Sequence, residues 1–218
     1  MNVPFFRPAI SDAEIGEVIA SLKSGWITVN TAQRVEEEFK AAVRGEHPVA
    51  VNSCTAALHL AVARVIGLRP GMAVLVPTMT FAATTEMVRY QGDAILVDCD
   101  PITFNMNLLD AEQKLADLRT GRLPDTIPQD TPVVGIIPVH VSGLMMDMAA
   151  VNEFAKRHDL WVVEDAAMRF PPRGDPMQTV RGSNAERTLR QFACYSFYAN
   201  KTITTGEGGM ATNKCRPR

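Results

Sequence analysis

The sequence predicts an α/β fold in which three layers are built on a mainly parallel sheet. Short apolar segments of strand length recur along the chain and alternate with helical segments. The apolar segments are continuous and do not alternate in polarity, which is typical of strands covered by helices on both faces. The composition agrees with a packed core, since 46% of the 218 residues are hydrophobic and 21% are charged.

The elements are predicted in the following order. A helix begins with the capping box Ser11 to Glu14 and ends at Gly25, and a second helix runs from about Ala32 to Arg44. Strand candidates are the segments 49–51, 74–76, 94–97, 133–139 and 160–163, and helical stretches lie near 56–66, 82–91, 108–119 and 147–158. This repeated strand-helix-strand order favours parallel pairing. We expect an N-terminal helical segment over residues 1–46 and one large α/β domain over residues 47–218.

Composition and charge argue against several classes of protein. The net charge of −2 gives no reason to expect binding to nucleic acid or to an anionic membrane, and no apolar run reaches 18 residues. The N-terminus carries no pattern of a secretory signal, so the four cysteines, which form no C-x-x-C pair, are expected to be reduced thiols in the cytoplasm. The histidines and cysteines lack metal-ligand spacing, so no metal site is expected.

Three segments could carry chemistry at the carboxyl ends of the strands, where ligands bind in such sheets. Ser53 to Ala56 begin a helix directly after a strand, as in a phosphate site, although alone an ordinary N-cap explains them more simply. Asp165 ends a buried strand and could hold a proton on a heteroaromatic nitrogen, or it could be a loop carboxylate. Lys201 lies among hydroxyl residues and glycines, where it could form a Schiff base or be a solvated loop lysine. The glycines nearby fit neither G-x-G-x-x-G nor a P-loop, which disfavours a dinucleotide or a nucleoside triphosphate.

Five motifs taken together and in order are more informative than any one segment. They are S-C-T-A-A-L-H, V-P-T-M-T-F-A-A-T, P-V-H-V-S-G, V-V-E-D-A-A and S-F-Y-A-N-K-T-I-T-T-G-E-G-G-M. In this order they resemble the DegT/DnrJ/EryC1/StrS family of aminotransferases, which use pyridoxal 5′-phosphate (PLP) and act on nucleotide-linked keto-sugars. The resemblance covers about residues 5–168 and 191–213. It implies the aspartate-aminotransferase-like fold (fold type I), with a large α/β domain that binds PLP and a smaller C-terminal domain.

The resemblance also implies roles for individual residues. Lys201 would bind the cofactor covalently and move protons, Asp165 would pair with the pyridinium nitrogen, and Phe81 would stack on the ring. The residues that would hold the phosphate are Ser53, Thr55, Ala56 and Ser196. The implied mechanism is ping-pong, with glutamate as amino donor and a keto-sugar as acceptor. The family forms homodimers with the active site at the interface, so a homodimer is expected.

Departures from the family pattern leave a second interpretation open. Met168 stands where the family usually has His or Gln near the phenolic oxygen of the cofactor, and the Arg-rich segment 169–190 is predicted to be a long surface loop. The chain is about half the size expected for the family, so the small domain is expected to be absent and turnover to be weak. The alternative is a non-catalytic remnant that keeps the fold and at most binds PLP. A sugar dehydratase of the same family would carry His in place of Lys201, which argues against that activity.

Overall fold

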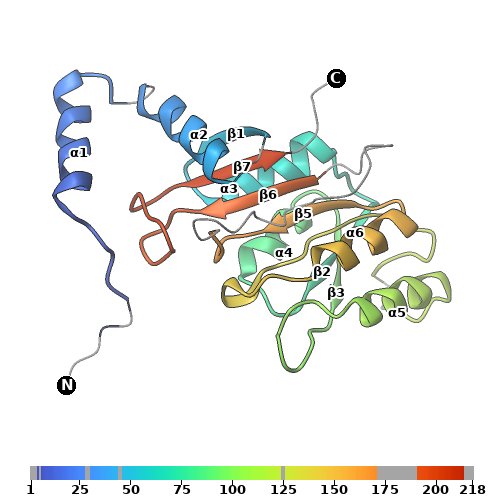
Figure 1. The fold of residues 1–218 in the computed structure, drawn as a ribbon. Helices are drawn as coiled ribbons and strands as arrows, with labels where there is room; N and C mark the ends of the chain where they lie inside the picture. Colours follow the sequence, from blue (N-terminus) through green and yellow to red (C-terminus); the bar gives the residue numbers. More distant parts are fainter. Residues whose placement is uncertain are drawn as a thin grey trace.

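A single mixed sheet forms the centre of the protein (Figure 1). The computed structural model describes residues 4, 6–27, 30–43, 46–123, 126–170 and 191–213. Within these residues seven strands lie in the order β1-β7-β6-β5-β4-β2-β3. The strands are β1 (Glu46–Val51), β2 (Ala73–Pro77), β3 (Asp93–Val97), β4 (Val133–Ile136), β5 (Trp161–Asp165), β6 (Gln191–Ser196) and β7 (Gly209–Asn213). The pairs from β3 to β6 are all parallel and only β7 pairs antiparallel, with β1 and β6, so the predicted α/β class is confirmed.

Helices cover both faces of the sheet. They are α1 (Asp12–Ser24), α2 (Asn30–Val43), α3 (Cys54–His59), α4 (Ala82–Arg89), α5 (Leu108–Arg119) and α6 (Met148–Arg157), with a π-helix η1 (Leu60–Ile66) and a 3-10 turn η2 (Val141–Gly143). Side chains alternate between the two faces of a strand, so neighbouring strand residues enter different cores. Leu75 packs in a cluster with residues of α5 and α6, while Val74 and Val76 pack in a cluster with residues of α3, η1 and α4.

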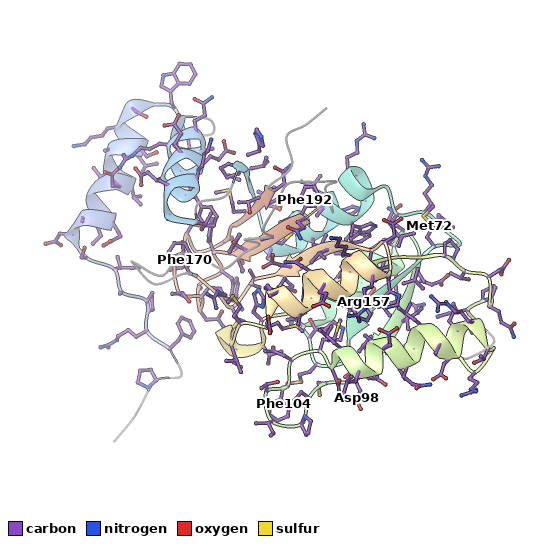
Figure 2. All side chains as sticks on the ribbon, turned by 45° about the vertical axis from the view of Figure 1, so that its right-hand side comes forward. Met72, Asp98, Phe104, Arg157, Phe170 and Phe192 are labelled. Atoms are coloured by element: carbon purple, nitrogen blue, oxygen red, sulfur yellow. The ribbon has the colours of Figure 1, made fainter. Side chains whose placement is uncertain are left out.

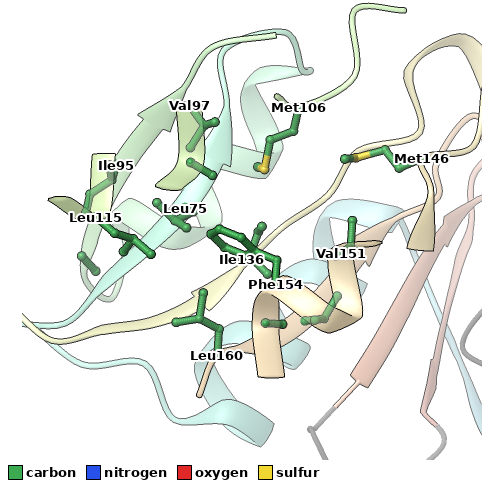
Figure 3. Packing of buried hydrophobic residues seen from close by; sticks show 14 of the residues in the cluster. Leu75, Ile95, Val97, Met106, Leu115, Ile136, Met146, Val151, Phe154 and Leu160 are labelled. Atoms are coloured by element: carbon green, nitrogen blue, oxygen red, sulfur yellow. The ribbon is translucent and has the colours of Figure 1, made fainter. Parts of the chain in front are cut away.

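The core between the sheet and helices α5 and α6 is closely packed (Figure 3). Ile136 of β4 and Leu75 of β2 are fully buried there, against Leu115 of α5 and Phe154 of α6. A smaller cluster on the same face joins Phe39 of α2 to residues of β6 and β7. Because these helices bury only one stripe each, their apolar side chains are arranged as the helical spacing in the sequence predicted.

The structure corrects two of the predicted elements. The strand expected over 133–139 ends at Ile136, because Pro138 has no N–H to donate to a neighbouring strand. Val139 beyond it forms only an isolated bridge to Asp165. The helix expected near 56–66 is a short α-helix, α3, that continues as the π-helix η1. Residues 171–190 of the predicted Arg-rich loop lie outside the described residues.

Helix α1 stands apart from the sheet (Figure 1). The capping box at Ser11 and the left-handed Gly25 at the other end confirm its predicted bounds. No residue of α1 is buried, and an ion pair between Glu17 and Arg34 joins it to α2. Among all the described residues, no helix is both long enough and apolar enough to cross a membrane.

Candidate active site

The carboxylate of Asp165 lies at the carboxyl end of β5 and is held from two sides. Its side chain is 5% exposed. Oδ2 accepts a hydrogen bond of 2.6 Å from the hydroxyl of Thr84 in α4, and Oδ1 accepts one of 3.1 Å from the N–H of Ala167. Both oxygens are therefore fixed in direction, on the face of the sheet that α3 and α4 cover.

The adjacent Glu164 points to the opposite face because successive strand residues alternate. It is fully buried, and its Oε2 lies 3.3 Å from Nε2 of the equally buried His140. Nδ1 of His140 accepts from the N–H of Met146 at 3.4 Å, so the proton of a neutral ring lies on Nε2, facing Glu164. The two neighbouring carboxylates thus have different surroundings, and only Asp165 lies beside α3 and α4.

Lys201 lies in the loop after β6. Its N–H bonds to the carbonyl oxygen of Tyr198, and its Nζ lies 2.7 Å from Sδ of Met168. The side chain lines a shallow hollow together with Ser196 and Phe170. The loop after β5 and the loop after β6 therefore meet at this end of the sheet. Phe170, one of the residues that line this hollow, is labelled in Figure 2.

The start of α3 lies close to the end of β6 because β7 runs between β1 and β6. Gly209, the first residue of β7, is opposite Val51 on one side and Ser196 on the other. A Cβ at Gly209 would lie only 2.4 Å from the carbonyl carbon of Ser53 and 2.6 Å from the N atom of Cys54. Only glycine permits this approach, which brings Ser196 to the same edge as the α3 start.

Ser53 is the N-cap of α3, as the sequence predicted for an ordinary cap. Its hydroxyl accepts from the N–H of Ala56 at 3.1 Å, and its side chain and those of Thr55 and Ala56 are half-buried. The Ala56 N–H that the resemblance assigns to phosphate binding is thus engaged by Ser53 here. A phosphate at this position would share the Ala56 N–H with the Ser53 hydroxyl, or would take the place of that hydroxyl as acceptor.

Phe81 is the N-cap of α4, and its side chain is 80% exposed. Its carbonyl oxygen accepts from the N–H of Thr84 at 3.0 Å, so Phe81 and the residue that binds Asp165 belong to one turn. The exposed aromatic ring and the threonine that binds the buried carboxylate therefore come from one turn, and such a ring can stack on another aromatic ring.

The thiol of Cys54, the first residue of α3, reports on the charges around it. Burial raises the pKa of Cys54 well above its ordinary value, and the nearby negative charge of Asp165 raises it further. The positive charge of Lys201 acts in the opposite direction on the same pKa. The carboxylate and the amine are therefore both close enough to α3 to act electrostatically at its start.

A comparison with protein families identifies the class of protein to which this site belongs. The model of the DegT/DnrJ/EryC1/StrS aminotransferase family matches residues 8–214. The chain belongs to the DegT/DnrJ/EryC1/StrS aminotransferase family. The family depends on PLP, and the matched range contains every residue to which the motifs assigned a role.

Several relatives in this family are named for sugar chemistry. The spore coat polysaccharide biosynthesis protein SpsC of Bacillus subtilis is 35% identical over 212 residues, which are 96% of this chain and 49% of that protein. GDP-perosamine synthase of Caulobacter vibrioides is 38% identical over 210 residues, which are 94% and 50%. Spr1654 of Streptococcus pneumoniae, assigned as a sugar aminotransferase and solved in its PLP form, has a TM-score of 0.78 at 31% identity, over 100% of this chain and 54% of that one. The chain spans about half the length of the relatives it matches.

The chemistry of the described groups fits PLP. A buried carboxylate with oriented oxygens, an amine and an exposed aromatic ring lie around one end of the sheet. Hydroxyl and N–H donors lie at the start of α3, where the approach of Gly209 leaves no room for a Cβ. Within the residues that the structure describes, no cluster of three or more His, Cys, Asp or Glu could hold a metal.

Thr84 also lies in this site, although the sequence motifs gave it no role. Thr84 belongs to the motif V-P-T-M-T-F-A-A-T, of which only Phe81 received a role. The signal was threonine at positions 80 and 84 on either side of Phe81, although Thr80 lies before the start of α4 and helical spacing alone does not bring the two together. The partner of Thr84, which is Asp165, lies 81 residues away in sequence and is visible only in the fold.

Proposed function

We propose that this chain is the cofactor-binding part of a PLP-dependent aminotransferase that moves an amino group from glutamate to a nucleotide-linked keto-sugar. The observation that carries the proposal is that Asp165, Lys201 and the start of α3 lie at one end of the sheet. Family membership supports the class of reaction. The names of SpsC and GDP-perosamine synthase support a sugar substrate in polysaccharide biosynthesis.

Asp165 and Phe81 would hold the cofactor ring. When bound, PLP supplies an electron sink that makes the Cα–H bond of an amino donor acidic. The Asp165 carboxylate, oriented by Thr84 and Ala167, would accept a hydrogen bond from the protonated ring nitrogen and keep its positive charge in place. Phe81, exposed at the start of α4, would cover one face of the ring and exclude water there.

Lys201 would attach the cofactor covalently and then move protons. Once the amino donor has displaced it from the cofactor, the Nζ of Lys201 would accept the proton from the Cα of that donor. It would then donate this proton to the carbon of the cofactor that bears the nitrogen. The phosphate would be bound by the start of α3 and the end of β6, which Gly209 brings together. The residues concerned are Ser53, Thr55, Ala56 and Ser196.

The domain organisation and assembly belong to the same proposal. Residues 1–46 would form a helical segment and residues 47–218 the PLP-binding domain. The protein would be a homodimer in the cytoplasm. Association is supported by the apolar side chains that α1 leaves exposed, among them Val18 and Leu22, at 60% and 59%. Such a surface is typical of a region that another protein surface covers.

A second candidate, a fold that binds PLP without turnover, is favoured by one observation. Met168 lies beside the Lys201 amine, and its thioether has no hydrogen to donate to a phenolic oxygen. Under this alternative the cofactor would bind, but the amino group of glutamate would not be transferred to it.

The test is reconstitution of the purified chain with PLP, borohydride reduction and peptide mass spectrometry. We expect the mass of the cofactor on the peptide that contains Lys201, and no labelling in Lys201→Ala. Lys156→Ala, which removes an exposed lysine of α6, is the matched control and should be labelled like the unchanged chain. Labelling at other lysines alone would contradict the proposal.

A second measurement separates the two candidates. Glutamate added to the loaded protein should convert the bound cofactor to pyridoxamine phosphate, followed by absorbance and chromatography. Asp165→Asn should slow this conversion at least a hundredfold, on the order of what loss of one preorganised electrostatic group costs. Binding without any conversion would favour the non-catalytic alternative.

A further inference from the structure

Two threonine hydroxyls form a short chain that ends on Asp165. Thr84 is 0% exposed, and its Oγ1 lies 2.6 Å from Oδ2 of Asp165. Oγ1 of Thr80 lies 2.7 Å from Oγ1 of Thr84. Thr80 is itself half-buried and precedes Phe81 directly. The two hydrogen bonds therefore run from the edge of the proposed ring site to the buried carboxylate.

The direction of donation along this chain follows from the number of hydrogens. A hydroxyl has one hydrogen to donate and can accept up to two, whereas an ionised carboxylate only accepts. The hydrogen of Thr84 therefore points to Asp165, and the 2.7 Å contact with Thr84 uses the hydrogen of Thr80. The other acceptor within reach of the Thr80 hydroxyl, the Phe81 carbonyl oxygen, is farther away at 3.4 Å. Hydrogen bonds in such a chain polarise one another, so the outer threonine strengthens the inner bond.

The consequence for Asp165 is that its carboxylate cannot rotate freely. Ala167 binds one oxygen through its N–H and Thr84 binds the other through its hydroxyl. The same turn of α4 carries Phe81, whose carbonyl oxygen accepts from the Thr84 N–H. One short segment thus carries both the hydroxyl that orients the carboxylate and the backbone of Phe81.

We propose that Thr84 is a positioning residue that aims the Asp165 carboxylate at the ring nitrogen of PLP, with Thr80 as its outer support. This inference rests on the proposed function and deepens it. A charged group misplaced by a fraction of an ångström binds a fixed partner less well, because a charge-assisted hydrogen bond depends on distance and angle. Removal of the Thr84 hydroxyl should therefore weaken binding of the cofactor without removing any group that touches it.

The central variant is Thr84→Val, which keeps the shape of the side chain and removes the hydroxyl. We expect the dissociation constant of PLP to rise about tenfold, equivalent to about 1.4 kcal/mol. The visible absorption band of the protein-bound cofactor gives a second measurement. The band changes with pH, and a positively charged ring nitrogen lowers the midpoint of that change. Because Thr84→Val weakens the contact of Asp165 with the protonated ring nitrogen, the midpoint of the pH titration should move upward in this variant.

Three further variants test whether the effect comes from the Thr84 hydroxyl. Thr84→Ser keeps the hydroxyl and should restore both values. Thr85→Val makes the same chemical change at the neighbouring, half-buried threonine of α4 and should behave like the unchanged chain. Thr80→Val should produce a smaller change in the same direction, about twofold to threefold in the dissociation constant since the Thr84 bond remains. It also provides the test if Thr84→Val does not fold.

The outcomes distinguish this inference from the function on which it rests. Weakened binding with a raised midpoint in Thr84→Val, together with rescue by Thr84→Ser, supports it. An unchanged chain that binds PLP, with Thr84→Val and Thr85→Val indistinguishable, overturns this inference and leaves the proposed function standing. Failure of the unchanged chain to attach PLP overturns both.

Discussion

At the scale of single residues, two neighbouring carboxylates in β5 have different surroundings because successive side chains of a strand point to opposite faces of the sheet. Asp165 lies on the face covered by α4 and accepts from Thr84, whereas Glu164 lies on the other face and faces His140. Both are buried, and both lie at the carboxyl end of a parallel strand. The hydrogen-bond partners on each face therefore decide which of the two is available to a ligand.

The first prediction concerns the buried Glu164–His140 contact. Glu164→Ala should lower the free energy of unfolding by about 3 kcal/mol, because it leaves the ring of His140 buried without its partner. Glu164→Gln keeps an acceptor and should cost about 1 kcal/mol. Urea unfolding measures both, and Glu153→Ala on the exposed side of α6 should change the value by less than about 0.5 kcal/mol. Equal stability of the Ala variant and the unchanged chain would contradict a stabilising role for this contact.

At the scale of elements, the contact of β7 with the start of α3 joins the sheet to the proposed phosphate site. Gly209 allows the two backbones to approach, and its position opposite Ser196 brings the end of β6 to the same place. The atoms that a Cβ would meet are backbone atoms, which do not move aside as a flexible side chain does. The identity of one residue therefore controls the relative position of two elements.

The second prediction follows from this contact. Gly209→Ala should destabilise the fold by about 1–3 kcal/mol, the usual cost of overpacking, and should weaken PLP binding more than tenfold because α3 must shift. Gly16→Ala in α1 is the control, since nothing lies within 4 Å of the added carbon. It should leave the dissociation constant of PLP unchanged. Normal PLP binding by Gly209→Ala would show that the contact does not build the site.

A second contact between elements depends on pH. Glu112 of α5 accepts from Nε2 of His158 at 3.0 Å and from Arg157, labelled on α6 in Figure 2, at 3.2 Å. The hydrogen bond from His158 lowers the pKa of Glu112 below its ordinary value of 4.5. A carboxyl whose pKa is lower in the folded state stabilises the fold above its unfolded pKa, and this contribution disappears as the pH falls through the folded pKa.

The third prediction is that loss of the Glu112 carboxylate destabilises the fold only at pH values where this group is ionised. Between pH 5 and pH 7, Glu112→Gln should lower the free energy of unfolding by less than about 1 kcal/mol, because the pair is half-exposed. The melting temperature should fall slightly as a result. The difference from the unchanged chain should narrow as the pH falls below about 4 and vanish near about pH 2. Thermal unfolding followed by circular dichroism across this range checks it. A difference that stays constant with pH would rule out the ionic contribution.

At the scale of the whole molecule, α1 is a helix that does not pack against the sheet. It has a complete capping box and a glycine at its end, yet none of its residues is buried. Apolar side chains on α1 and just after it are exposed, and they are Ile15, Val18, Ile19, Leu22, Trp26 and Ile27. A helix with such a row of side chains gains its stability by packing against another surface.

The fourth prediction is that the chain associates through this helix. Light scattering at micromolar concentration should show a dimer or larger species. The double change Val18→Glu and Leu22→Glu should shift the chain toward the monomer, whereas Lys23→Gln, a polar change on the same helix, should not. A monomer at micromolar concentration in the unchanged chain would contradict the proposed homodimer.

Much of the fold was predictable from local patterns. The continuous apolar segments 74–76, 94–97 and 160–163 identified β2, β3 and β5 because buried parallel strands carry no polar face. The capping box at Ser11 located the start of α1, since the cap satisfies N–H groups within a single turn. Where a prediction was too long, as over 133–139, a proline interrupted the hydrogen bonds of an otherwise apolar run.

The sequence by itself determined the fold class, the family and the kinds of group that the site contains, because periodicity and motifs are local properties of the chain. Only the tertiary structure decided which groups meet. Thr84 reaches Asp165 across 81 residues, and Gly209 places the end of β6 beside the start of α3 through an antiparallel strand that no pattern predicted. The physical reason is that the order of the strands arises from the packing of the whole sheet against its helices, and the spacing of residues along the chain does not encode it.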